Sequence, residues 1–165
     1  ISVLQQLLSQ VMAFRILAFF VEVLPIFILV VIFLNLNMLW YTYIFVLIAM
    51  IFSFFINFFI SYLIGLLSFW LYKSESFQWL TFWAFMMLSG QFVPLEFFGE
   101  TFFMISKYMP FYYLRYGVAQ IFLNKFTIDQ TINFISIQLI WIIILYEISR
   151  FLWNKALKKY GAVGG

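Results

Sequence analysis

Cysteine and histidine are absent from this 165-residue chain, and charged residues make up only 9% of it. Without a thiol or an imidazole, the chain has no means to form a disulfide, a zinc site of the usual kind or a Ser-His-Asp triad. The pattern GxxxxGK[ST], which cradles nucleotide phosphates, is also missing, so we expect this chain to bind no nucleotide. A formal charge of +3, scattered along the sequence, does not indicate a nucleic-acid partner.

Apolar residues dominate what is present: 67% of the chain is hydrophobic and 25% is aromatic. A soluble domain has roughly 25% charged residues and about half apolar ones, so a soluble fold of this size has no room to bury this much apolar surface. The composition predicts an all-α, polytopic integral membrane protein. The chain starts with Ile1 and shows neither a basic start nor a cleavage site in its first residues. Because the first residue is Ile rather than Met, we expect an N-terminally truncated fragment.

Four apolar stretches fit membrane-spanning helices, which need about 20 residues each. We expect spans at 16–34, 43–68, 77–92 and 128–150. Thr127 and Gln130 form a capping-box pattern ahead of the last of these. The same helix is expected to continue through a cytoplasmic tail, 151–165, and to stop near Gly161.

The first 15 residues are too polar and too short for a span. Their leucines follow helical spacing, with glutamines opposite, including Gln6 and Gln10. We predict a cytoplasmic amphipathic helix at 1–15 lying on the membrane surface. The alternative is the tail of an earlier span.

The stretch between the last two spans mixes breakers, charges and aromatic rings. It opens with Ser89-Gly90 and Pro94, where a helix should end, and Pro110 should restart one. Between Glu96 and Lys107, charged and polar residues alternate with phenylalanines, which is typical of a helix in a membrane interface. We expect residues 93–126 to form interfacial or re-entrant helices outside the membrane.

The basic residues predict the orientation. With four spans, one side of the membrane receives both chain ends and six basic residues: Arg15, Lys73, Arg150, Lys155, Lys158 and Lys159. The other side receives Lys107, Arg115 and Lys125 together with three acidic residues. The positive-inside rule then places both ends in the cytoplasm and 93–126 outside. The basic C-terminal run is also suited to anionic lipid.

Several polar residues stand out as candidate sites. Glu22 is the one carboxylate inside a predicted span, where it either marks function or snorkels to the interface. A stripe four residues apart either packs against another helix or lines a substrate path. Its members are Ser53, Asn57, Ser61 and Gly65. The charges around the external stretch either are simply solvated or form a gate. They are Glu96, Glu100, Lys107 and Arg115.

Two motifs carry a family resemblance: SGxFxPLxFF at 89–98 and PFYYxxYxxxxIF at 110–122. In this order, with flanking spans and the tail YGAVGG, they resemble the permease subunits of type-2 ABC transporters, the ABC-2 family transporter proteins. The resemblance implies the last four of six spans of an exporter permease, with no enzymatic activity of its own. It also implies a second permease subunit and a separate ATPase that holds ATP and magnesium. Residues 1–15, with Gln6 and Gln10, are then the candidate ATPase contact, and the external charges are the candidate gate.

Two other functions stay open at this point. A secondary transporter would use discontinuous helices near the membrane midplane and an ionisable site, for which Glu22 is the one candidate. An integral membrane enzyme acting on lipids would need converging catalytic groups, and the scattered carboxylates of this chain do not converge in the sequence.

Overall fold

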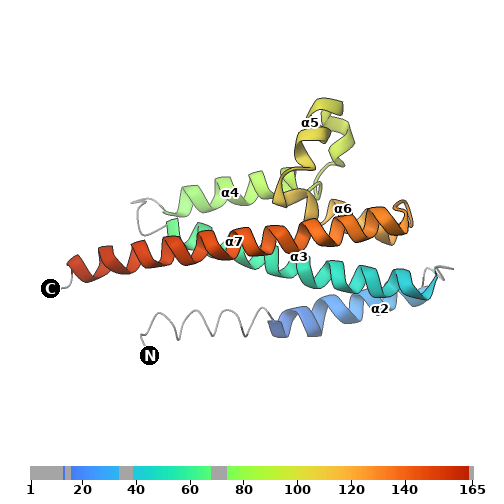
Figure 1. Cartoon of the computed structure of the whole chain (residues 1–165), viewed down its shortest axis with the longest axis horizontal. Helices are drawn as coiled ribbons and strands as arrows, with labels where there is room; N and C mark the ends of the chain where they lie inside the picture. The colour runs from blue at the N-terminus through green and yellow to red at the C-terminus, as the bar shows by residue number, and fades with distance from the viewer. Residues whose placement is uncertain (1–12, 14–15, 34–38, 68–73, 164–165) are drawn as a thin grey trace. The chain divides into compact units, whose positions relative to one another are not determined.

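Residues 13, 16–33, 39–67 and 74–163 are the part of the chain that the computed structural model describes. Within that part every regular element is helical, so the expected all-α class is confirmed (Figure 1). Contacts divide the chain into two compact units, Ile1–Met38 and Leu39–Gly165. The predicted surface helix at 1–15 lies almost wholly outside the described residues.

The first unit holds a π-helical turn, η1 (Phe19–Val23), that leads directly into α2 (Leu24–Phe33). Pro25 stands at the start of α2 and has no N–H, so one α-helical hydrogen bond is lost at this point. The widened turn accompanies that loss, and π turns of this kind occur often at functional sites. Glu22 belongs to η1.

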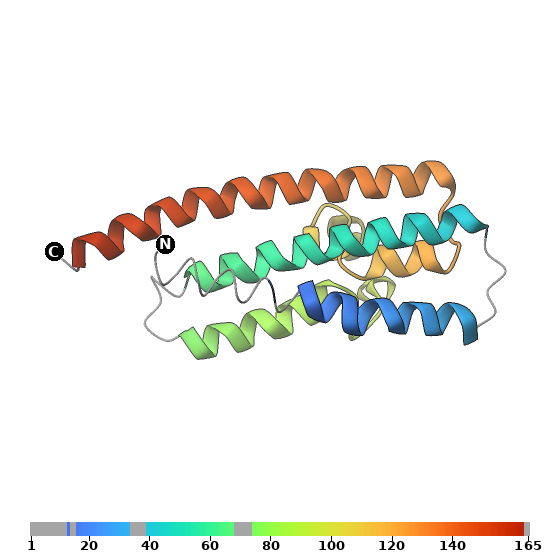
Figure 2. The ribbon, with the colours of Figure 1, turned by 90° about the horizontal axis from the view of Figure 1, so that it is seen from below.

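The second unit is built on two long helices, α3 (Trp40–Leu67) and α7 (Ile128–Val163). Their 28 and 36 residues correspond to about 42 Å and about 54 Å of helix. The Phe59 ring meets Tyr146, and further along Tyr62 meets Trp153. Because later residues of α3 meet later residues of α7, the two helices run parallel and side by side (Figures 1 and 2).

Most buried residues of the two helices follow helical spacing, so each helix presents one main stripe to the other. In α3 the stripe contains Thr42, Val46, Ala49, Ser53 and Ile56. In α7 it contains Thr131, Phe134, Gln138, Leu145, Ser149 and Ala156. The opposite faces carry exposed isoleucines and aromatic residues. Such faces suit lipid rather than water.

Because α3 and α7 run in the same direction, the chain that connects them must return to the end at which α3 begins. The helix α4 (Ser74–Leu88) begins this return, and its 15 residues cover about 22 Å. It ends at Leu88, directly before Ser89-Gly90, as the breaker cluster predicts; Gly90 has φ 69°, which favours glycine. The later helix α6 (Tyr116–Phe122) packs against α3 and leads towards the start of α7.

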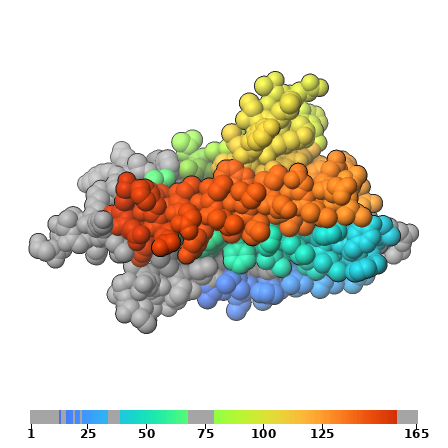
Figure 3. All heavy atoms as spheres, viewed as in Figure 1, coloured from blue at the N-terminus to red at the C-terminus, as the bar shows by residue number. Residues whose placement is uncertain are grey.

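Between α4 and α7 lie residues 93–126, named the external segment here after their predicted position. This segment consists of η2 (Leu95–Phe98), α5 (Glu100–Ser106), η3 (Pro110–Tyr113) and then α6. The expected single helix from Glu96 to Lys107 is wrong, because Gly99 at φ 88° separates η2 from α5. Pro110 does restart a helix at its first turn, as predicted. Figures 1 and 3 show α5 projecting from the side of the α3–α7 pair.

The start of α7 has the predicted capping box. The backbone N–H of Gln130 donates to Thr127 Oγ1 at 3.3 Å, and the Thr127 N–H donates to Gln130 Oε1 at 3.0 Å. Asp129 lies in the first turn, where a negative charge favours the helix dipole. The helix continues past Gly161, its predicted end, to Val163.

Two described helices are long and apolar enough to cross a membrane: Trp40–Leu67 and Ile128–Ala156. The segments expected as the other two spans give shorter apolar helices, Leu24–Phe33 and Trp79–Leu88. The four-span topology therefore remains a prediction, whereas two candidate spans are a feature of the fold.

Candidate functional site

The backbone carbonyl of Tyr113 in η3 is hydrogen-bonded to both long helices, and the group of hydrogen bonds around it is called the junction here. Ser53 Oγ of α3 donates to this oxygen at 2.8 Å, and Gln138 Nε2 of α7 donates to it at 2.9 Å. Gln138 Nε2 also lies within hydrogen-bonding distance of the Ala49 carbonyl, at 3.1 Å, and of Ser53 Oγ, at 3.0 Å, so its two N–H groups are shared among three acceptors. One amide group thus connects α3, α7 and η3.

This junction lies well inside the length of both helices. Ser53 follows Trp40 by 13 residues, or about 20 Å of helix, and Gln138 follows Ile128 by 10 residues, or about 15 Å. The external segment therefore reaches down beside the α3–α7 pair instead of ending at its tip. Gln138 and Ser53 are 0% and 8% exposed, so the hydrogen bonds form away from solvent.

The orientation of the Gln138 amide follows from its neighbours. Two of the three atoms around it are carbonyl oxygens, which only accept, so the amide must direct its NH₂ group towards them. Its own oxygen, Oε1, is then buried with no hydrogen-bond partner among the described residues. A hydrogen bond between membrane helices contributes about 0.6–1.7 kcal/mol.

Aromatic rings surround the junction. Phe134 of α7 packs against Tyr113, with ring centroids 5.0 Å apart, and against Tyr112 at 6.2 Å. Phe103 of α5 meets Tyr112 and Tyr116 edge-on. Edge-to-face pairs of this kind stabilise by about 0.5–1.5 kcal/mol beyond the burial of their area. These rings thus form an apolar cluster that packs around the hydrogen-bonded groups.

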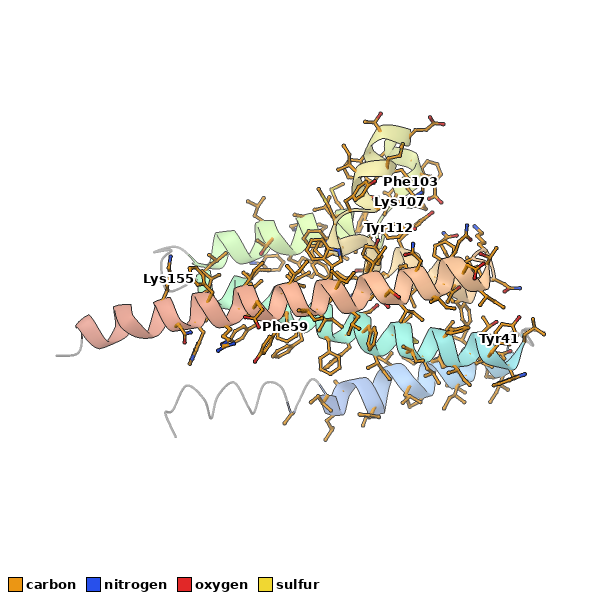
Figure 4. The ribbon with its side chains drawn as sticks, in the orientation of Figure 1. Tyr41, Phe59, Phe103, Lys107, Tyr112 and Lys155 are labelled. Carbon is orange, nitrogen blue, oxygen red and sulfur yellow. The ribbon has the colours of Figure 1, made fainter. Side chains whose placement is uncertain are left out.

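The predicted gate charges lie on or beside this cluster. Glu96 Oε1 accepts a hydrogen bond from the Tyr116 hydroxyl. Lys107 Nζ lies 4.5 Å from the centre of the Phe103 ring, and its backbone carbonyl accepts from the Tyr113 hydroxyl at 2.8 Å. Figure 4 shows Phe103, Lys107 and Tyr112 gathered at the base of α5. Two gate candidates therefore belong to one connected group.

The other two gate candidates lie outside this group. Glu100 is exposed in the first turn of α5, a favourable place for a carboxylate. Arg115 follows η3, and desolvation lowers the pKa of its guanidinium from the usual value. The role of all four residues as a gate stays a prediction.

The phenols at the junction are held in their neutral form. Burial raises the pKa of Tyr112 to about 12, and the nearby Tyr113 and Glu96 groups act in the same direction. For Tyr116, burial and the hydrogen bond to Glu96 both raise the pKa. Neutral phenols keep their protons available as donors throughout the physiological range.

The four members of the polar stripe of α3 differ in their burial. Ser53 is buried and belongs to the junction, whereas Asn57 and Ser61 are half-buried. Gly65 is exposed, and among the described residues a Cβ added there would meet no atom within 4 Å beyond its own helix backbone. Its place in a helix-to-helix contact or a substrate path remains a prediction. Gln6 and Gln10 lie outside the described residues.

Gln138 is the residue that the sequence interpretation overlooked. It is the only amide in the apolar stretch from Ile135 to Ile144, so an unexplained polar group in a predicted span was the available signal. Its three acceptors come from residues 25 to 89 positions away, which no local pattern reveals.

The described residues offer no group of three or more metal-ligating side chains. The junction is built of amide, hydroxyl and carbonyl groups, and its three hydrogen-bonded elements come from separate parts of the chain. Such an arrangement joins segments of the chain.

These features define an α-helical membrane protein with two candidate spans. The segment that lies between these spans in the sequence folds back against both of them. Residues 1–164 match the family described as ABC-2 family transporter protein, and the chain belongs to that family. The family supplies membrane permeases of ABC transporters, so the resemblance noted in the two loop motifs is confirmed. A search of curated proteins and a search of solved structures each returned no match.

Proposed function

We propose that this chain is part of the permease subunit of an ABC exporter. Family membership carries the proposal, and the segment folded back against α3 and α7 supports it. Two permease subunits would enclose the substrate path between them. Two ATPase subunits, which hold ATP and magnesium, would drive alternating access, in which the path opens first to one side of the membrane and then to the other.

The proposed location is the cytoplasmic membrane, with both ends of the chain in the cytoplasm. The family and the exposed apolar faces of α3 and α7 support a membrane location, and the distribution of basic residues supports this orientation. Lipids would cover the exposed isoleucines of α7. The external segment would then lie at the outer end of the path, where it is placed to control access.

Partnership with an ATPase is tested by capture. The tagged full-length permease is purified from native membranes in mild detergent, and bound polypeptides are identified by mass spectrometry. We expect a polypeptide with the GxxxxGK[ST] sequence to copurify in near-equal amount. An unrelated membrane protein with the same tag is the control. If the permease is intact and the two samples contain the same polypeptides, the ATPase partnership is wrong.

The predicted contact with the ATPase lies in residues 1–15. Gln6→Glu combined with Gln10→Glu adds two well-solvated charges to the polar face of that helix, so membrane insertion should be retained. If this face binds the ATPase, the double variant should reduce copurification. A matched change on the external side, Gln91→Glu with Gln120→Glu, should leave copurification unchanged. Equal copurification of all three proteins would remove residues 1–15 as the contact.

A further inference from the structure

We propose that Gln138 is a releasable latch for the external segment, and that its amide decides whether η3 stays against the α3–α7 pair. This inference rests on the proposed permease function for its purpose, but its geometry is independent of any ATPase. The latch consists of Gln138, Ser53 and the carbonyl of Tyr113. Gln138 is a positioning residue, because it acts by holding Tyr113 rather than by touching a substrate.

The hydrogen bonds divide into two sets with different consequences. Those from Gln138 to Ala49 and Ser53 join α7 to α3, and both can persist when η3 moves. Those from Gln138 and Ser53 to the Tyr113 carbonyl are the side-chain bonds at this junction that hold η3. Release therefore requires the loss of both hydrogen bonds at this oxygen atom and of the ring contacts that Phe134 makes with Tyr112 and Tyr113, while the long helices remain paired.

Gln138 Nε2 has three acceptors within hydrogen-bonding distance but carries two hydrogens, so the bond to Tyr113 competes with those to Ala49 and Ser53. When η3 departs, the amide keeps the acceptors on α3 and stays hydrogen-bonded. A segment whose departure leaves its donor fully bonded has the balance expected of a two-state element.

A reporter beside the latch makes its state measurable. Leu114 follows Tyr113 directly and is 6% exposed, so Leu114→Cys should react slowly with a thiol reagent while η3 is held. Ser149→Cys is the control reporter, because Ser149 is 3% exposed in the α7 stripe and lies on the far side of Leu145 from the latch. Labelling is performed on the full-length permease in open membrane fragments, where the reagent reaches both faces.

Gln138→Leu replaces the amide by an apolar side chain of similar size, which can still pack in the α7 stripe. We expect labelling of the Leu114→Cys reporter to rise roughly tenfold, the factor that corresponds to about 1.4 kcal/mol. Labelling of the Ser149→Cys reporter should not change. Ser53→Ala, a smaller change, should raise labelling of the first reporter by a smaller factor. Ser136→Ala is the matched control, since its hydroxyl donates within α7 to Ile132, and it should change neither reporter.

Gln138→Glu separates a latch from a simple packing role. A neutral carboxyl group still donates one hydrogen bond, whereas an ionised one only accepts and is repelled by the carbonyls of Ala49 and Tyr113. Burial raises a carboxyl pKa, so labelling of Leu114→Cys should be low at about pH 5 and high at about pH 9. Values are normalised to the same reporter with Gln138 intact at each pH.

Three results would overturn the latch. The first is unchanged labelling of Leu114→Cys in Gln138→Leu. The second is an equal rise at both reporters, which indicates general loosening. The third is a Gln138→Glu variant without pH dependence. Because labelling needs no nucleotide, failure of the latch is distinguishable from absence of an ATPase in the capture experiment.

Discussion

Gly117 of α6 lies directly against the ring of Phe134 on α7. A Cβ at Gly117 would overlap the edge of that ring, with Cζ at 2.6 Å and Cδ2 at 3.0 Å. The absence of a side chain thus allows α6 to approach α7 closely enough for Phe134 to reach Tyr112 and Tyr113. Gly117 is thus part of the contact between the external segment and α7.

Gly117→Ala should therefore destabilise the fold. Overpacking of a filled site costs about 1–3 kcal/mol, and the ring of Phe134 has to move to accept the methyl group. Gly65→Ala is the matched control, because it adds the same group within a helix at a place where no neighbouring element among the described residues comes within 4 Å of the new Cβ. Thermal unfolding in detergent should show a lower midpoint for the first variant only. Equal midpoints for the two variants would contradict the close contact.

Thr127→Ala should loosen the start of α7. The substitution removes the Oγ1 atom that accepts from Gln130, and loss of such a cap typically costs about 1 kcal/mol. Hydrogen exchange of the amides in the first turn, around Gln130, should accelerate about fivefold, as expected from this energy. Exchange near Gln138, two turns further along, should stay unchanged. Acceleration along the whole helix would indicate a larger role than capping.

Alkaline pH should weaken the packing of the external segment. The pKa of Tyr112 is raised to about 12 in the folded chain, while an unfolded tyrosine ionises near pH 10. The unfolded state therefore loses this proton first, and the stabilisation is complete below about pH 10 and is lost as pH rises through about 12. Tyr112→Phe removes this proton and should make stability fall less between these values. Denaturant midpoints measured across this range check the expectation, and parallel curves for both proteins would contradict it.

Orientation in the membrane is testable because the chain contains no cysteine. We expect Lys107→Cys to react with an impermeant thiol reagent on whole cells, and Lys73→Cys to react only after the cells are opened. The reason is the excess of basic residues on the side of Lys73. A cysteine-free version of the full-length permease is the background for both variants. Reaction at position 73 but not at 107 in whole cells would reverse the topology.

Much of the fold was predictable from the sequence because it follows local rules. The capping box of Thr127 and Gln130, the end of α4 before Gly90 and the restart at Pro110 all depend on neighbouring residues. The break at Gly99 was missed, since the alternating charges and phenylalanines around it fit one continuous interfacial helix. A single glycine is tolerated within many helices, so its presence alone did not predict the left-handed conformation.

The candidate site was predictable only in part. The sequence identified Ser53 by its place in a polar stripe, and Glu96 and Lys107 by their charge, but it gave no sign that they surround one junction. Gln138 was missed because its acceptors on Ala49, Ser53 and Tyr113 are brought together by the parallel packing of α3 and α7. The register between two apolar helices depends on side-chain packing along their whole length, which composition and periodicity do not specify.

If the proposed ATPase partner acts through the latch, ATP hydrolysis on that partner should move the external segment of this chain. The most direct measurement compares labelling of the Leu114→Cys reporter in whole cells that contain either the active ATPase partner or a variant of it without its P-loop lysine. We expect several-fold faster labelling with the active partner, because only that partner would drive release of η3 from Gln138 and Ser53. The Ser149→Cys reporter should label at the same slow rate in both. Equal labelling of Leu114→Cys with active and inactive partners, in cells where the two ATPases copurify equally, would contradict the account.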